Sequence, residues 1–211
     1  MSHTIRAISL LAALTSAVGC GQAAGEGEGR APVMFADNCA PCHGDAGQGN
    51  VELAAPAIAG LPAWYVDAQL HKFRNGDRGN HAQDLPGLRM RPMARTLPEG
   101  DVTLLASHVA GLAPHAPTRT VQGDADKGKA LYATCAACHG PDGKGNEALN
   151  APPIGQLDDW YIVTQIHNFK NGIRGADPDD TTGAQMAPMA NTLPDEAAVH
   201  DVIAYLGTLG N

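Results

Sequence analysis

Cysteine and histidine recur together in two short stretches, Cys39-Ala-Pro-Cys42-His43 and Cys135-Ala-Ala-Cys138-His139. Two thiols at this spacing can each add to one of the two vinyl groups of a haem, and the adjacent imidazole can then bind the iron. A zinc site is the competing interpretation of a Cys-x-x-Cys pair, but zinc ribbons space their two pairs far more closely. The two motifs therefore predict two covalently attached c-type haems, with His43 and His139 each supplying one axial ligand.

The second axial ligand of each iron must come from later in the chain. A methionine thioether is a soft ligand that suits haem iron and raises its reduction potential. The candidates are Met90 or Met93 after the first motif, and Met186 or Met189 after the second. Each pair encloses a proline, and we expect both pairs to lie in loops just before a helix. Spacing alone does not choose within a pair.

The whole chain is a tandem repeat. A shift of 96 residues carries Cys42 onto Cys138 and aligns the sequence with itself without a gap, from about Phe35 to about Gly111. This period is far longer than that of a solenoid repeat, so each copy is expected to be a small domain. We expect an export signal at residues 1–20, a flexible tether at 21–32, a first domain at 33–112, a linker at 113–123 and a second domain at 124–211.

Helical patterns position the motifs within each copy. A short helix is expected to enter each motif, at about 33–38 and 125–134, with a glycine-rich loop after it. A middle helix begins near Pro62 or Asp158 and ends at an Asn-Gly pair, which is a typical helix stop. A last helix begins after Pro98 or Pro194. Nothing alternates as a strand would, so the sequence predicts an all-α fold of two small helical domains.

Composition limits the possible classes of protein. Aromatic residues make up only 4% of the chain, with 25 glycines and 15 prolines, which is poor material for two small protein cores. A buried porphyrin in each domain would replace the missing aromatic bulk. The net charge of −8 makes nucleic acid an improbable partner, because phosphate binding needs basic surface.

Residues 1–20 have the pattern of an export signal. The apolar run from Ala7 to Val18 is too short to cross a bilayer as a mature helix and indicates an extracytoplasmic destination. Cys20 follows Ala17-Val18-Gly19 like the cysteine that is lipidated in a lipoprotein, although leucine would be usual at position 17. Ordinary cleavage nearby, for example after Ala23, is the alternative. Membrane attachment through a lipid on Cys20 is therefore an open expectation.

The order of these motifs resembles class I cytochrome c, and their duplication resembles the dihaem cytochrome c4 family over about residues 33–210. The resemblance implies Met90 and Met186 as the iron ligands, with Met93 and Met189 as alternates. It also implies that the ligand histidines donate to the carbonyls of Pro56 and Pro152. Tyr65 and Tyr161 would lie near a haem propionate, and Trp64 and Trp160 over the haem edge, with simple core packing as the alternative for these aromatics.

The expected function is outer-sphere electron transfer rather than catalysis, because a methionine is available to fill the sixth position of each iron. The resemblance implies redox partners such as a quinol-oxidising complex and a terminal oxidase or reductase. Two alternatives are a haem-bearing subunit of a larger respiratory complex and a dihaem enzyme, such as a peroxidase or a sulfur-compound oxidase. Residues 124–211 are more acidic than residues 25–112, so the two ends could dock different partners by charge complementarity.

Overall fold

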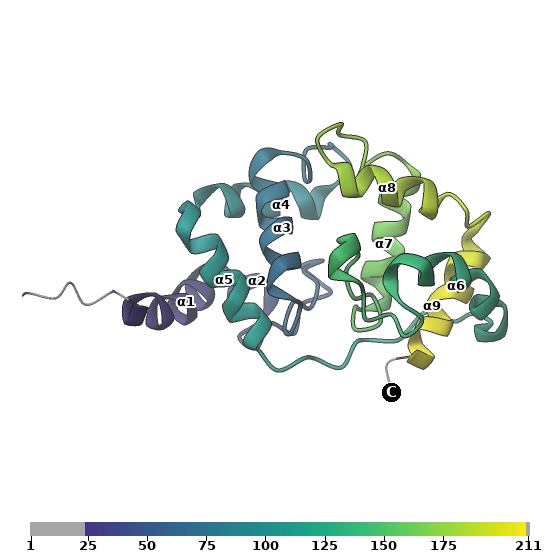
Figure 1. Cartoon of the computed structure of the whole chain (residues 1–211), viewed down its shortest axis with the longest axis horizontal. Coiled ribbons are helices and arrows are strands. Elements are labelled where there is room, and N and C mark those ends of the chain that lie inside the picture. The colour runs from purple at the N-terminus through teal and green to yellow at the C-terminus, as the bar shows by residue number, and fades with distance from the viewer. Residues whose placement is uncertain (1–23, 210–211) are drawn as a thin grey trace, which may run out of the picture.

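The computed structural model describes residues 24–209, which fold into two helical lobes joined by an extended segment (Figure 1). The helices of the first lobe are α1 (Ala24–Asn38), α2 (Ala40–His43), α3 (Ala63–Asn75), α4 (Leu85–Thr96) and α5 (Glu99–Gly111). Those of the second are α6 (Ala125–His139), the short 3-10 helix η1 (Glu147–Leu149), α7 (Asp159–Lys170), α8 (Thr181–Ala190) and α9 (Glu196–Leu209). No β-strand is present over this range, which confirms the predicted all-α fold.

The first and last helices of each lobe pack against each other, α1 against α5 and α6 against α9. Leu105 and Val109 of α5 bury their side chains against Phe35 of α1. Val202 and Leu206 of α9 belong to a larger buried cluster in the second lobe. Burying these apolar side chains provides the main stabilisation of each helix pair and fixes where the cysteine motif emerges from the first helix.

The two lobes are not related by one constant shift, so the gapless alignment is wrong at its ends. Phe35 and Tyr132 are the deeply buried aromatics of the two first helices, and they are 97 residues apart. The first lobe has one more residue between this aromatic and its motif, and its helix is interrupted at Cys39, whereas α6 runs unbroken to His139. The last helices are also offset by 97, since Asp195 is an extra residue before α9.

Gly128 permits the close crossing of α6 and α9. A Cβ atom at this position would lie 1.8 Å from the carbonyl oxygen of Asp201. Only glycine lets the two backbones approach this closely without a clash. Ala31, at 5% exposure, is the corresponding residue of α1 at the 97-residue offset, so the first lobe tolerates a methyl group there.

The middle helices end where the sequence predicts. Gly76 follows α3 with φ +98° in the left-handed region, and its N–H bonds to the carbonyl of Lys72. In the second lobe, Asn171 caps α7 and Gly172 follows with φ +67°. Glycine adopts this conformation at little cost, which is why an Asn-Gly pair stops a helix.

The predicted tether is wrong over residues 24–32, which belong to α1. Ala31 is buried, and the Arg30 guanidinium donates to the buried carboxylate of Asp101 at 2.6 Å. The tether was expected because glycines and glutamates alternate there, but packing against α5 stabilises the helix despite its poor propensity. The prediction for residues 21–23 falls outside the described residues.

The methionine pairs do not lie in loops, as the sequence suggested. Met90 and Met93 belong to α4, and Met186 and Met189 belong to α8, with a proline inside each helix. Both helices begin at an aspartate N-cap: Asp84 accepts from the Gly87 N–H, and Asp180 from the Gly183 N–H. These caps stabilise the short helices and set the direction in which the methionines point.

The connecting segment at 113–124 carries no helix and is bound to the second lobe. Its Arg119 donates to the carbonyls of Leu157 and Gly155 at 2.5 and 2.6 Å. Backbone N–H groups of Thr118 and Val121 donate to the carboxylates of Asp158 and Asp159. The linker is therefore attached along much of its length rather than free.

The export signal at 1–20 and Cys20 lie outside the described residues. Between residues 24 and 209, no helix is both long enough and apolar enough to cross a membrane.

Candidate haem sites

Each cysteine motif presents its histidine in the same way. The Nδ1 of His43 donates to the carbonyl oxygen of Pro56 at 2.8 Å, and that of His139 donates to Pro152 at the same distance. A carbonyl can only accept, so Nδ1 carries the proton and the Nε2 lone pair remains available for a metal. Burial lowers the pKa of both histidines, because desolvation disfavours the imidazolium. The rings are thus neutral, oriented and suited to binding iron.

A tight turn brings each proline carbonyl to its histidine. Asn50 pairs with Ala55 in the first lobe, and Asn146 pairs with Ala151 in the second, so the chain doubles back just before the proline. At Gly145, a Cβ atom would lie 2.6 Å from the carbonyl oxygen of Ala151, so this crossing requires glycine. The glycine-rich loop predicted from the sequence therefore positions the proline carbonyl that accepts the hydrogen bond from the histidine Nδ1.

The two cysteines of each motif differ in exposure. Cys39 and Cys135 are half-buried, whereas Cys42 and Cys138 are exposed. Burial raises the pKa of the Cys39 thiol to about 11 and also raises that of Cys135. Each motif thus offers two thiols, two residues apart and next to its histidine, which is the spacing that thioether formation with one haem requires.

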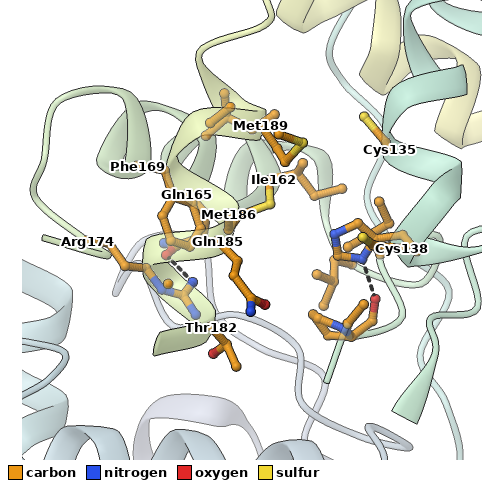
Figure 2. A pocket seen from close by; sticks show the side chains of 18 of the residues that line it. Cys135, Cys138, Ile162, Gln165, Phe169, Arg174, Thr182, Gln185, Met186 and Met189 are labelled. Atoms are coloured by element: carbon orange, nitrogen blue, oxygen red, sulfur yellow. Dashed lines mark hydrogen bonds between the residues drawn. The ribbon is translucent and has the colours of Figure 1, made fainter. Parts of the chain in front are cut away.

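A cavity in the second lobe separates the cysteine motif from α8 (Figure 2). Cys135 and Cys138 lie on one side, and Met186 and Met189 lie across from them on α8. The wall between is largely apolar and includes Ile162, Ile166, Phe169, Leu193, Val202 and Leu206. An apolar slot with a histidine on one face and a thioether on the other matches the demands of a haem ring.

Burial distinguishes the two methionines of each pair. Met186 is half-buried and packs against the core of the second lobe, whereas the Met189 side chain is 39% exposed. In the first lobe Met90 packs against buried residues of α3 to α5, while Met93 is 41% exposed. The inward position favours Met90 and Met186 as iron ligands, and we carry that assignment forward as a proposal.

A polar network joins the two lobes beside this cavity. Arg78 donates within its own lobe to Gln69 at 2.9 Å, and across the interface to the Tyr161 hydroxyl at 2.8 Å. Arg174 mirrors it, donating to Gln165 at 2.8 Å and across to Gln69 at 3.0 Å. Both arginines are buried, and each lies over a phenylalanine ring of its own lobe.

From the sequence, Arg78 was expected only to add to a basic region around the methionines of the first domain, and Arg174 was given no role, although a signal for the interface was present. Arg78 and Arg174 match across the repeat, as do Gln69 and Gln165, but such a match does not reveal that the two sets meet at an interface. The lining of the second cavity includes Tyr65 and Gln69 from the first lobe, so the second site is completed by the other domain.

Arg174 offers a test of whether a haem fits. Its side chain lines the second cavity, and its Nε–H is buried without a hydrogen-bond partner among the described residues. An orphaned guanidinium N–H at the polar end of an apolar slot suits a carboxylate, and a haem carries two propionates. The residues present therefore fit the cofactor: Cys135, Cys138, His139 and Met186 would surround the ring, and Arg174 would lie at its propionate edge.

Each middle helix carries a tryptophan followed directly by a tyrosine, and the two residues make different contacts. Trp64 packs edge-on against Tyr65, with ring centroids 5.8 Å apart, and Trp160 against Tyr161 at 5.9 Å. Tyr65 and Tyr161 face the interdomain arginines. The resemblance to class I cytochrome c implies that a haem propionate lies near these tyrosines, so both remain candidates for contact with a propionate. The two tryptophans pack against their neighbouring tyrosines, and Trp64 also packs against the buried core cluster.

Two further histidines lie outside both sites. His71 donates through Nδ1 to the backbone carbonyl of Asp67, and its Nε2 pairs with the Glu99 carboxylate at 2.9 Å. His167 pairs with Glu196 at 2.7 Å in the second lobe. Both therefore link a middle helix to a last helix and are not placed to bind iron.

Comparisons with known proteins agree with this architecture. The family model described as Cytochrome c matches residues 29–113 and again residues 125–210. A thiosulfate dehydrogenase electron acceptor from Thiomonas intermedia is 34% identical over 68% of this chain and 67% of its own length. A subunit of a cbb3-type cytochrome c oxidase from Azorhizobium caulinodans is 35% identical over 84% of this chain and 58% of that relative. The structure of cytochrome c4 from Acidithiobacillus ferrooxidans superposes with a TM-score of 0.64 at 27% identity, covering 82% of this chain and 99% of that structure.

Proposed function

We propose that this chain carries single electrons between redox proteins outside the cytoplasm. The premise is that it belongs to the cytochrome c family, as a tandem member similar to cytochrome c4 with two covalently bound haem c groups. The observation that carries the proposal is the second cavity, where a neutral histidine and an inward methionine face each other across an apolar slot. We place Met90 and Met186 opposite His43 and His139 as the axial ligands.

Bound haem supplies an iron that changes between the ferrous and ferric states by one electron. His43 with Met90, and His139 with Met186, would each hold one iron between two ligands, so that little would move when the electron arrives or leaves. The carbonyls of Pro56 and Pro152 orient the histidines, and the apolar wall excludes water. The exposed Cys42 and Cys138 lie at the edge of each site, where a partner protein can approach.

The domain interface is the natural route between the two haems. The second cavity is lined by Tyr65 and Gln69 from the first lobe, and Arg78 bonds directly to Tyr161 of the second. We propose that the propionate edge of the second site faces the first domain. An electron accepted at one haem can therefore leave from the other without dissociation of the carrier.

Relatives indicate the class of partner. One is an electron acceptor for thiosulfate dehydrogenase, and another is a subunit of a terminal oxidase. We propose an oxidoreductase such as a quinol-oxidising complex as donor, and a terminal oxidase or reductase as acceptor. Lipidation at Cys20 would keep the carrier at the membrane surface. Exposed Arg89 and Arg95 on α4, beside the proposed ligand Met90, favour a partner with an acidic face for the first domain.

The test is stoichiometric electron transfer by the purified holoprotein. We expect it to take up two electrons from a reduced donor, to deliver both to an oxidised acceptor, and to bind no carbon monoxide when reduced at neutral pH. Carbon monoxide binding, or turnover of peroxide or thiosulfate by the protein alone, would contradict the proposal and support a dihaem enzyme.

A haem-bearing subunit of a larger complex is the second candidate, favoured by the match to an oxidase subunit over 84% of this chain. Co-purification with other subunits at a constant ratio, through a salt wash and size-exclusion chromatography, would support this candidate. Recovery of the protein free of such subunits would support the carrier.

A further inference from the structure

A single lysine crosses from the first domain to the N-terminus of α8. The Lys72 ammonium on α3 forms an ion pair with the Asp180 carboxylate and also donates to the Thr182 hydroxyl. The Asp180 side chain is 0% exposed and that of Lys72 only 15%. Asp180 is the N-cap of α8, where its Oδ1 accepts from the Gly183 N–H at 2.9 Å.

This ion pair compensates a charge that α8 cannot otherwise accommodate. The second carboxylate oxygen of Asp180 is buried and has no hydrogen-bond partner in the part of the chain that the structure describes. A buried carboxylate without a counter-charge is strongly destabilising. Lys72 is therefore what permits an ionised cap at this helix, and the helix carries Met186 six residues after the cap.

Several further carboxylates surround the Lys72–Asp180 ion pair, and the Lys72 charge reduces the repulsion among them. Asp77 of the first domain faces Asp177 and Asp179 of the second, and its pKa is raised by burial and by these carboxylates together with Asp180. Lys72 is the cation that opposes this effect. Without its charge, carboxylates from the two domains would repel each other across the interface at the start of α8.

The repeat contains no reciprocal contact. The position that matches Lys72 in the second domain is Asn168, and the cap that matches Asp180 is Asp84 of α4. Within residues 24–209, Asn168 and Asp84 share no hydrogen bond, and the Asp84 carboxylate accepts only from the Gly87 N–H of its own helix. The methionine helix of the second domain is thus supported by the first domain, whereas that of the first domain is not supported in return.

We propose that Lys72 is a positioning residue for the second haem, which holds α8 through Asp180 so that Met186 stays on the iron. The inference rests on the proposed ligation by Met186. The dependence is directional: disturbing the domain interface weakens the methionine bond of the second haem and leaves that of the first unchanged. A partner that docks at the interface could thereby alter one haem selectively.

The test uses the ferric holoprotein and the proton resonances of the two iron-bound methionine methyl groups, assigned by the signal lost in Met186→Leu. In Lys72→Met we expect the fraction of the second haem without methionine to rise about tenfold, because Asp180 loses its counter-charge. The Met90 signal should keep its full intensity. Lys127→Met removes an equally charged but exposed pair with Asp124, and should change neither signal.

A double variant separates this role from a general loss of stability. Asp180→Asn retains an oxygen that can accept from Gly183 but needs no counter-charge, so Lys72→Met with Asp180→Asn should restore the Met186 signal. An unchanged signal in Lys72→Met, equal losses at both haems, or no recovery in the double variant would overturn the inference while leaving the carrier function intact. Absence of the Met186 signal from the unsubstituted protein would overturn both.

Discussion

At the scale of single residues, burial separates side chains that the sequence presents as equivalent. Met186 packs against the core and Met189 is 39% exposed, although both line the cavity. We predict that Met186→Leu abolishes the red charge-transfer band of one ferric haem and leaves that of the other. The band should be lost because leucine offers no sulfur to the iron.

Met189→Leu is the matched control and should retain both bands. If instead Met189→Leu loses a band and Met186→Leu does not, the outer methionine is the ligand and the helix must rotate when haem binds. Absorption spectra of the two oxidised variants, with haem content measured on the same samples, decide between these assignments.

The chemistry of the site could be predicted from the sequence, because it is local. Cys135, Cys138 and His139 lie within five consecutive residues, so their geometry follows from one helical turn. The interdomain arginines could not be predicted. Arg78 reaches Tyr161 only because the two domains pack face to face, and a repeated residue in a sequence does not indicate which surface meets which.

At the scale of helices, the crossing of α6 and α9 depends on Gly128. We predict that Gly128→Ala lowers the free energy of unfolding of the second domain by roughly 1–3 kcal/mol, because the added methyl group would overlap the carbonyl of Asp201. Gly100→Ala on α5 is the control, since a Cβ there meets nothing within 4 Å. It should be neutral or stabilising by up to about 1 kcal/mol. Denaturant unfolding of the two holoproteins measures both, and equal effects would contradict the tight crossing.

The contact between α3 and α5 should depend on pH through His71. The hydrogen bond to Glu99 raises the pKa of His71, partly offset by desolvation. The protonated ring therefore stabilises the folded state fully below about pH 6.5, its pKa when unfolded, and this contribution is lost as pH rises through the higher folded pKa. We predict that the stability advantage of the natural protein over His71→Gln shrinks over the pH range from about 6.5 upward.

Unfolding free energies measured across that pH range test this dependence. His115→Gln, in the linker, is the control and should show no comparable trend. An advantage that grows with pH would mean that the neutral ring, rather than the imidazolium, makes the stabilising contact.

The sequence predicted most of the helices, but it did not predict all of their boundaries. The Asn-Gly stops of α3 and α7 act locally and are found where expected. The methionine segments were expected to be loops because each contains a proline, yet the caps at Asp84 and Asp180 hold them helical. Helix α1 includes residues that the sequence predicted to be a flexible tether. That prediction failed because packing against α5 stabilises the helix, and local composition does not reveal such a tertiary contact.

At the scale of the whole molecule, the two domains differ in charge around corresponding helices. Arg89, Arg91 and Arg95 of α4 correspond to Gln185 and Ala187 of α8 and to Asn191, which follows that helix. Arg91 is bonded to Asn80 at 2.7 Å, whereas Arg95 is exposed. The first domain therefore offers a basic face beside its methionine helix, and the second domain does not.

We predict that Arg95→Glu slows electron transfer with an anionic reagent by about two- to tenfold at low ionic strength, because it reverses a charge that steers the encounter. The effect should diminish as salt is added. Lys129→Glu, on exposed surface of α6 in the second domain, makes the same charge change and should have a smaller effect. Stopped-flow rates across a series of ionic strengths would show this, and equal slowing by both substitutions would mean that only net charge matters.

We propose that a histidine and a methionine fill both ligand positions of each iron, so that the protein carries electrons rather than transforming a substrate. The most direct measurement is the red charge-transfer band of methionine-ligated ferric haem in the purified protein, with the number of attached haems counted by mass. We expect two attached haems and a band of full strength for both. Two haems with a missing or half-strength band would contradict the proposal, because at least one iron would then have another ligand or an open position.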